Sequence, residues 1–487
     1  MTLERRTFLK GSAAVAGGVA MAGPFAGLVA GPAAAIGAAP FRGLRATPDL
    51  RDGKVRLHLP EGFSYRSFHD TQSVPPPLVD GKTMPGRHDG MGAFEGPDGA
   101  VTLIRNHEVS GSGTPFGAVG SWTYDTGARG GCVHVDVTGE GEVLGEHTAI
   151  NGTANNCSGG QMPWGAWVTC EETVNGPDVG PDFTGASNAG FTKKHGYVFE
   201  VPVTGRSAAM PITQAGRFAH EAVSFDPREG RLYLTEDNFA FPSGFYRYTP
   251  GTNPMESGHL DNDGHLQMLA VKGQPNAHLE GHQDKGAVYD VEWVDIADPD
   301  PTFTPGPGGV LPTNDSALVA VGDQGRALGA AGFSRLEGQI YDNGVVYFTS
   351  TQGGGDAETG PELIAGYGNG FGQVWAYDTR SEKLRLVYQS PGKQTFDFPD
   401  NITVSNRGTL VVCEDSNQDN YIRGLNKGGQ LWDIALNRAA NANGTPRFDD
   451  EFAGSTFSPD KSTLFVNIQA SAGLTFAIWG PWHTIGV

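Results

Sequence analysis

The stretch Gly230-Arg231-Leu232-Tyr233-Leu234-Thr235-Glu236-Asp237-Asn238 decides the fold, because its plan recurs along the chain. A turn glycine precedes a short apolar run, and acidic residues stand where that run ends. Such runs between Gly, Asn and Asp turns are typical of β-strands, and no long stretch shows sustained helical periodicity. The 72 glycines and 32 prolines of the chain also favour many turns and little helix.

Five other stretches follow the same plan: 99–108, 165–172, 344–352, 408–415 and 462–469. The six runs recur at a period of about 60 residues, with one interval about twice as long, which fits repeating units of four strands. A pair of β-sandwiches would not place acids at equivalent positions of successive units. The sequence therefore predicts an all-β, six-bladed β-propeller. Acids at equivalent positions would then meet at its central channel, where a metal cluster is expected to offset their repulsion. We expect a single domain over residues 40–487, with an insertion at about 239–343.

The N-terminus has the pattern of a twin-arginine export signal over residues 1–39. Arg5 and Arg6 precede Phe8, Leu9 and Lys10, and a weakly apolar Ala/Gly run follows. Prolines interrupt that run, so it is a poor membrane span. We therefore expect the twin-arginine machinery to export the folded chain to the periplasm or the medium.

Net charge limits which partners the chain can bind, and cysteine content limits how it can be cross-linked. The formal net charge is -20 at pH 7, which disfavours nucleic acid and anionic membranes, so neither is expected as a partner of the mature protein. The four cysteines are too few for a disulfide scaffold, although one disulfide outside the cell stays open. We expect a monomer.

Carboxylates stand at the ends of the repeated strands or just before them. They are Glu108, Glu171, Glu172, Glu221, Asp237, Glu337, Asp400 and Glu414. If these side chains meet at the channel, only bound cations could offset their repulsion. If they do not meet, they are solvated turn acids.

Cys157, in Asn156-Cys157-Ser158-Gly159-Gly160, adds a soft sulfur ligand near the hard oxygens of Glu171 and Glu172. This combination suggests a mixed-metal centre, and the alternative is a buried structural cysteine. Arg335 lies two positions from Glu337 on an expected extended strand, so both side chains should point the same way. Arg335 would then hold a phosphate or form an ion pair with Glu337.

From about Leu59 onward the chain resembles the PhoX family of secreted, calcium- and iron-dependent alkaline phosphatases. The resemblance depends on short motifs at 59–63, 87–91, 156–160, 163–165, 170–172, 216–221, 335–338 and 399–401. It implies a six-bladed propeller with two ferric ions, bridged by an oxo group, and calcium ions at the channel. It also implies a small phosphate-ester substrate, hydrolysed by metal-assisted attack of an oxygen nucleophile.

The resemblance implies roles for individual residues. Cys157, Glu221 and Glu337 would be iron ligands, and Arg335 would contact the phosphate. Glu108, Asp400 and either Glu171 or Glu172 would bind calcium or bridge ions. Glu337 and Arg335 are the expected catalytic residues. Two other classes stay open: a calcium-dependent propeller that hydrolyses lactones or phosphotriesters, and a non-catalytic, calcium-stabilised binding propeller.

Overall fold

The computed structural model describes residues 43–487, so the expected export signal lies outside the described residues. Strands dominate, and they form six sheets. One sheet comprises β6 (His88–Glu95), β7 (Val101–His107), β8 (Gly130–Val137) and β9 (Val143–Thr153), and the next comprises β10 (Asn156–Met162), β11 (Ala166–Glu171) and β12 (Val198–Pro202). A nine-stranded sheet comprises β13 (His220–Asp226), β14 (Arg231–Glu236), β15 (Phe245–Thr249), β16 (His265–Val271), β17 (Val288–Asp295), β21 (Lys383–Gln389), β20 (Gln373–Asp378), β19 (Val345–Ser350) and β18 (Leu336–Asp342).

The remaining sheets combine the two ends of the described chain. One comprises β1 (Arg45–Pro48), β2 (Val55–Leu59), β25 (Leu431–Asn437), β24 (Tyr421–Leu425), β23 (Leu410–Glu414) and β22 (Pro399–Val404). Another comprises β26 (Glu451–Phe457), β27 (Thr463–Gln469), β28 (Leu474–Trp479) and β3 (Ser64–Phe68), and β4 (Leu78–Val79) pairs with β5 (Lys82–Thr83). The helices are short: α2 (Pro254–Ser257), α3 (Asn314–Leu318), α4 (Ala320–Ala327), η1 (Pro97–Gly99), η2 (Asn188–Gly190), η3 (Thr213–Ala215), η4 (Pro307–Gly309) and η5 (Trp482–Ile485).

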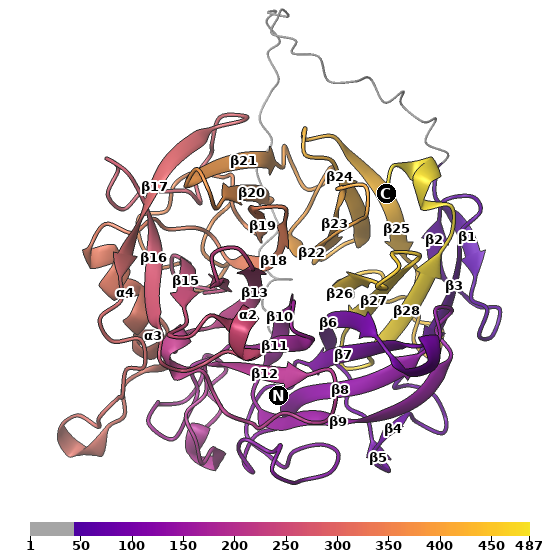
Figure 1. Cartoon of the computed structure of the whole chain (residues 1–487), viewed down its shortest axis with the longest axis horizontal. Helices are drawn as coiled ribbons and strands as arrows, with labels where there is room; N and C mark the ends of the chain where they lie inside the picture. The colour runs from indigo at the N-terminus through magenta and orange to yellow at the C-terminus, as the bar shows by residue number, and fades with distance from the viewer. Residues whose placement is uncertain (1–42) are drawn as a thin grey trace, which may run out of the picture.

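The sheets are arranged like the blades of a propeller, around the middle of the molecule (Figure 1). The six innermost strands contact one another in cyclic order: β6, β10, β13, β18, β22, β26 and back to β6. A cavity of about 170 Å³ lies between them, lined by side chains from the later part of each strand. The expected all-β, propeller-like arrangement is therefore confirmed.

The hydrogen-bonded sheets differ from six separate four-stranded blades. β17 pairs with β16 on one side and with β21 on the other, which joins two units into the nine-stranded sheet. The sheet that begins at β10 has only three strands, whereas β2 and β1 extend the sheet of β22 at its outer edge. The sequence pattern could not show this, because it locates strands but does not fix which edges pair.

The repeated stretches of the sequence correspond to one strand of each unit. They form β7, β11, β14, β19, β23 and β27, each paired with an innermost strand. The expected insertion at 239–343 includes strands of the regular sheet, because β15, β16, β17 and β18 lie in it. The longer interval between repeats contains β15, β16 and β18, the extra strand β17, and short helices with their loops. Within residues 43–487, no helix has the length and apolar character needed to cross a membrane.

The apolar runs are continuous because these strands are covered on both faces. In β27, Leu464 and Val466 join a buried cluster with β22-sheet residues such as Val411. Phe465, between them, packs instead with Leu103 and neighbours from the sheet of β6. Alternate residues of a strand point to opposite faces, so both faces need apolar side chains when a sheet lies between two others.

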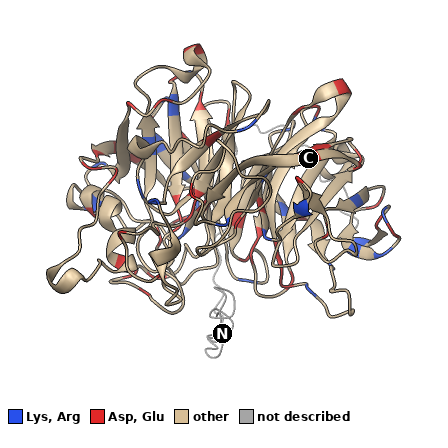
Figure 2. Cartoon of the chain, turned by 90° about the horizontal axis from the view of Figure 1, so that it is seen from below, with Lys and Arg blue, Asp and Glu red and all other residues tan. Residues whose placement is uncertain are grey.

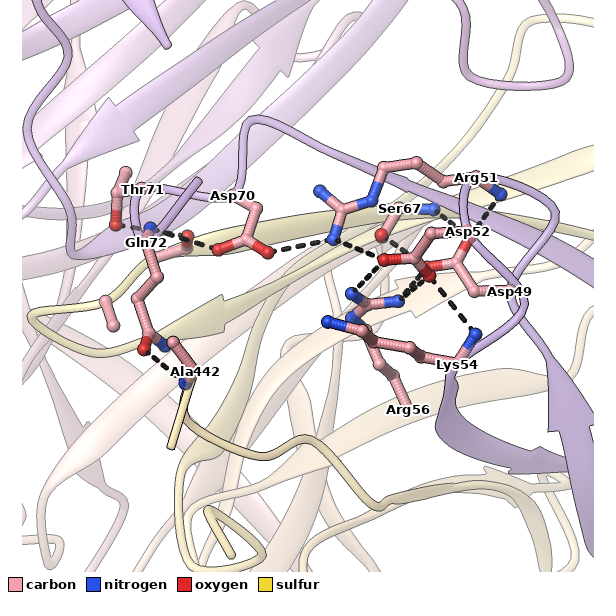
Figure 3. Close-up of polar contacts among 12 residues, drawn as sticks. Asp49, Arg51, Asp52, Lys54, Arg56, Ser67, Asp70, Thr71, Gln72 and Ala442 are labelled. Atoms are coloured by element: carbon pink, nitrogen blue, oxygen red, sulfur yellow. Dashed lines mark hydrogen bonds and ion pairs between the residues drawn. The ribbon is translucent and has the colours of Figure 1, made fainter. Parts of the chain in front are cut away.

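An ion-pair network with a buried centre joins β2 and the turn before it to β3 (Figure 3). Arg56 donates to Asp49 at 2.7 Å and to both carboxylate oxygens of Asp52 at 2.7 and 2.8 Å. Asp49 also accepts hydrogen bonds from the backbone and hydroxyl of Ser67 in β3. Because β2 belongs to the sheet of β22 and β3 to the sheet of β26, this network stabilises the contact between these two sheets.

Replacing Arg56 by alanine is expected to lower the free energy of unfolding by about 3 kcal/mol, because it leaves the buried Asp49 carboxylate without its cation. Arg45→Ala is the control: its pair with Glu61 is exposed (54% and 45%) and should be worth less than about 1 kcal/mol. Urea unfolding of both variants measures the difference. Equal stabilities would contradict a supporting role for this network.

Candidate metal centre

The starts of the innermost strands surround a cavity of about 90 Å³, which we call the central acidic cavity. Its lining is Arg87, Asp89, Glu108, Cys157, Glu172, Glu221, Asp237, Phe239, Arg335, Glu337, Asp400, Asp415, Glu451 and Gln469. Acidic positions are also spread over the periphery, but several lie among the strands in the middle of the molecule (Figure 2). Of the residues that the sequence singled out, only Glu171 and Glu414 do not line this cavity.

A repeated β-bulge explains how the ligand candidates converge. The register of each innermost strand shifts just after its first part, for example between His220 and Val223 in β13. The residues that follow the last regular pair before the shift are Asp89, Cys157, Glu221, Glu337, Asp400 and Gly454. Bulges re-aim side chains, so five of the six equivalent positions present a ligand atom to the same cavity.

The sixth position is a glycine for a steric reason. Gly454 has a φ of +61°, and a Cβ there would lie 2.2 Å from the carbonyl oxygen of Asp89. A side chain is therefore excluded at this point of the ring.

A second set of acids comes from the neighbouring strands. Glu108, Glu172, Asp237 and Asp415 each follow the residue that pairs with the start of an innermost strand. The pairing residues themselves, Glu171, Glu236 and Glu414 among them, point the opposite way, as the alternation of a strand requires. In each pair of consecutive acids, which we call an acidic doublet, only the second side chain thus points into the cavity.

Glu171 is accordingly placed elsewhere, and its expected position beside the other ligands is wrong. Its carboxylate accepts hydrogen bonds from the backbone of Ala154, Gly196 and Tyr197 and lies 2.6 Å from Nδ1 of His195. Burial alone would lower the pKa of His195, but the charges of Glu171 and Asp125 raise it to about 9. Glu171 therefore belongs to a buried ion-pair network inside the blade.

The distances between donor atoms suit metal ions. One group of possible ligand atoms joins Cys157, Glu172 and Glu221, and another joins Glu221, Glu337 and Asp400. Within each group the atoms lie within 4.8 Å of one another. Glu221 is common to both, so two neighbouring ions would share it as a bridge.

The electrostatics of the cavity also call for cations. Burial and the nearby Glu172 raise the pKa of Glu221 well above its usual range, and burial with Asp237 does the same for Glu337. Burial and Asp415 raise the pKa of Asp400 to about 8. Burial and Glu221 also raise the pKa of the Cys157 thiol. These shifts reverse when bound cations stabilise the charged forms, so the donor set fits a cluster of hard and borderline metal ions.

Arg335 is held by two carboxylates. Its Nε and Nη2 donate to Asp237 at 3.2 and 2.9 Å, and Nη2 also donates to Glu337 at 2.8 Å. Its backbone is not extended as expected, since its φ is +39°. It precedes β18, and this left-handed turn brings its side chain beside Glu337 inside the cavity.

Sequence reasoning missed Asp89, Asp415 and Glu451 as candidate ligands. Asp89 lies in the 87–91 motif, and Asp415 follows Glu414, which the sequence had suggested instead. Glu414 in fact pairs with Arg423 at 2.9 Å. The doublet rule would have found Asp415, whereas no pattern in the sequence marks the bulge that aims Asp89.

Comparison with known protein families matches residues 139–472 to the family described as alkaline phosphatase PhoX. The chain belongs to the PhoX family of alkaline phosphatases. Members of this family are phosphomonoesterases that depend on metal ions. The acidic groups of the cavity are suited to hold such ions. Residues 2–22 match the signal sequence of the twin-arginine translocation pathway, which directs export to the periplasm or beyond.

One solved structure agrees with this membership at the level of the fold. Pseudomonas fluorescens PhoX, in complex with vanadate as a transition state analogue, has a TM-score of 0.61 at 16% identity. The match covers 90% of this chain and 97% of that one. A gluconolactonase from Xanthomonas campestris matches at 12% identity with a TM-score of 0.38, covering 90% of this chain and 98% of that one. Comparison with curated protein sequences finds no match.

Proposed function

We propose that this PhoX-family chain hydrolyses phosphate monoesters with Fe³⁺ and Ca²⁺ ions held in the central acidic cavity. The observation that carries the proposal is the convergence of Cys157, Glu221, Glu337 and Asp400 from equivalent bulges of different innermost strands. A thiolate beside several carboxylates suits iron, and an excess of carboxylate oxygens suits calcium.

The proposal assigns a role to each part of the cavity. Cys157, Glu221 and Glu337 hold iron, whereas Glu108, Glu172 and Asp400 hold calcium or bridge ions. Bound ions supply positive charge that attracts phosphoryl oxygens and neutralises the charge that develops as the ester bond breaks. Asp89 occupies the bulge position of its innermost strand, and Asp415 occupies the position that Glu108 and Glu172 have in their units. Both therefore add carboxylate oxygens to the shell around the ions.

Arg335 combines the two roles that its sequence position suggested. Its Nε and Nη2 orient Asp237 and Glu337, while its Nη1 makes only a 3.5 Å contact with Gln352 among residues 43–487. Nη1 is therefore the guanidinium nitrogen that donates to a phosphoryl oxygen of the substrate. Because Arg335 is 5% exposed, this charge acts with little solvent screening.

The same proposal covers the organisation of the chain. Residues 1–39 are the export signal, and residues 40–487 form one six-bladed propeller that acts as a monomer. The closed ring of six innermost strands supports six blades, as does the bulge that recurs in each of them. In this description β17 is an extra strand that bridges two blades.

Hydrolysis of p-nitrophenyl phosphate by the exported protein tests the proposed function. We expect turnover in calcium buffer, loss of at least about 90% of it after chelation, and recovery on adding calcium back. Iron and calcium content are measured on the same samples. A metal-loaded sample that does not hydrolyse this ester would contradict the proposal.

Chelation should also change how stability depends on pH. The pKa of Asp400 is raised from 3.8 to about 8. A carboxyl whose pKa is higher in the folded state stabilises the fold below its unfolded pKa, and this contribution is lost as pH rises through the folded pKa. We therefore expect the metal-free protein to have a lower melting temperature at pH about 9 than at pH about 6. A metal-free melting temperature that stays constant or rises over this range would contradict this crowding of carboxylates.

A further inference from the structure

The backbone carbonyls of the ligand candidates lie at the bulges of the innermost strands, where the regular ladder is interrupted. A bulge leaves the extra residue without its ladder partner, and a buried carbonyl needs another donor. Four of the five carbonyls accept a hydrogen bond from a buried side chain: Cys157 from Asn106 Nδ2 at 3.0 Å, Glu337 from Thr235 Oγ1 at 2.7 Å, Asp400 from Thr349 Oγ1 at 2.7 Å and Asp89 from Asn467 Nδ2 at 2.5 Å. The carbonyl oxygen of Glu221 lies 3.5 Å from Sγ of Cys157.

These four hydrogen bonds all run between neighbouring units. Each donor belongs to the strand beside an innermost strand, and each acceptor belongs to the innermost strand of the next unit around the ring. All four donor side chains are 0% exposed. The bonds therefore connect the backbone of a ligand residue to the unit before it.

Three of the donors occupy equivalent positions. Thr235 lies between Leu234 and Glu236, which pair with β13 on the two sides of its bulge. Asn106 and Thr349 have the same place opposite the bulges of β6 and β18. Since the position recurs in units of different sequence, the geometry of the units brings the donor to the carbonyl.

The threonine hydroxyls direct their single proton to the ligand residue. Thr349 Oγ1 lies 2.7 Å from the carbonyl oxygen of Asp400 and 3.3 Å from that of Gly338 in its own unit. Thr235 Oγ1 lies 2.7 Å from the carbonyl oxygen of Glu337 and 3.2 Å from that of Ala222. A hydroxyl donates one hydrogen, so the shorter contact in the next unit receives it.

Asn106 is held in one orientation by its other partners. Its Oδ1 accepts from Trp167 Nε1 at 3.0 Å and from Thr169 Oγ1 at 3.1 Å. Its Nδ2 therefore faces the bulge of β10, where it donates to the carbonyls of Cys157 and Ser158 at 3.0 and 2.7 Å. An amide with both ends bonded is a rigid link between the units.

Neighbouring bulges also touch directly, which leaves them little freedom to shift. A Cβ on Gly90 would lie 2.5 Å from Cα of Ser158 in the next unit, and a Cβ on Gly338 would lie 2.7 Å from Cα of Asn401. The backbones approach this closely only because both positions are glycine. Hydrogen bonds across such a contact set the spacing of the ligand residues.

We propose that Asn106, Thr235, Thr349 and Asn467 are positioning residues of the metal centre, each fixing the distance between ligands of two neighbouring units. The proposal rests on the metal-dependent function proposed above and adds the groups that organise its ligands. None of the four lines the central acidic cavity, so they act through the backbone of the ligand residue. Their loss should weaken metal binding without removing a ligand.

Thr349 offers the sharpest test, because valine keeps its shape without the hydroxyl and serine keeps the hydroxyl. Calcium affinity of the exported protein is measured by competition with a chelator. We expect Thr349→Val to raise the Kd for calcium about 10-fold and Thr349→Ser to stay within about 2-fold of the unsubstituted protein. Thr235→Val and Thr235→Ser repeat the comparison at Glu337, with retained iron as the readout.

Thr463→Val is the matched control. Thr463 is buried and its Oγ1 donates to the carbonyl of Gly139 at 2.7 Å, at the end of β27 away from Gln469. This variant also loses one hydrogen bond to a carbonyl, so the melting temperature of the metal-free protein should fall to a similar extent in both valine variants. Calcium affinity should fall only in Thr349→Val.

The outcomes separate positioning from general packing. Unchanged calcium affinity in Thr349→Val, an equal loss in Thr463→Val, or no recovery in Thr349→Ser would each overturn the assignment. Weakened binding in Thr349→Val alone, restored by serine, supports it even if phosphate monoesters are not hydrolysed, a result that would contradict the proposed function. An exported protein that binds neither calcium nor iron would overturn both.

Discussion

Replacing Glu221 by glutamine is expected to remove most of the bound metal and to lower kcat for phosphate monoesters at least about 1,000-fold. Glu221 belongs to both groups of ligand atoms, so its loss affects two neighbouring ion sites at once. The amide keeps the shape of the side chain but loses the negative charge that a bridging position requires. Metal analysis and steady-state kinetics on the purified variant measure the two effects.

Glu236→Gln is the matched control for this substitution. Glu236 is also buried, and burial raises its pKa to about 7, so a neutral side chain is well tolerated there. Its carboxylate accepts hydrogen bonds from Gly244 and Tyr246 inside the blade. The control should keep its metals and its kcat. A Glu221→Gln enzyme with full metal content and rate would contradict the assignment of the cavity.

The neighbours Glu171 and Glu172 are expected to respond in opposite ways to the same substitution. Glu172→Gln should reduce metal content and lower kcat about 100-fold, with little change in the stability of the metal-free protein. Glu171→Gln should keep the metals but lower the free energy of unfolding by about 3 kcal/mol, because the buried His195 loses one of its two carboxylate partners. Each variant controls for the other, since the two residues are adjacent in the chain.

Denaturant unfolding and metal analysis of this pair test the alternation of the strand directly. If Glu171→Gln lost the metals and Glu172→Gln kept them, the orientation of the strand end would be the reverse of the one described here. If both variants lost metals equally, the doublet would act as one ligand unit. Either result would contradict the division of roles between the two side chains.

The fold was predictable where the signal is local. Runs such as 230–238 carry both a strand and its end in consecutive residues, so their repetition predicts an all-β, propeller-like fold. The pairing of β17 with β21 was not predictable, because it joins residues about 95 positions apart through backbone groups that any sequence offers. The same applies to β3, which completes a sheet with strands from the other end of the chain.

The sequence predicted which residues supply the candidate site better than it predicted which way each side chain points. Glu108, Glu221, Glu337 and Asp400 line the central acidic cavity, as their positions at or just before the repeated strands suggested. Cys157, singled out as a soft sulfur ligand, lines it as well. The choice between Glu171 and Glu172 depends on the pleat at a single position, which the spacing of acids does not reveal. Asp89 and Arg335 depend on a bulge and on a left-handed turn, features of the backbone that no local motif specifies.

We propose that iron and calcium ions occupy the central acidic cavity. Anomalous diffraction from crystals of the exported protein, recorded on both sides of the iron absorption edge, tests it most directly. We expect iron peaks within bonding distance of Cys157, Glu221 and Glu337, and calcium density beside Asp400 and Glu172. Metal peaks located elsewhere, or a cavity without metal in an active enzyme, would contradict it.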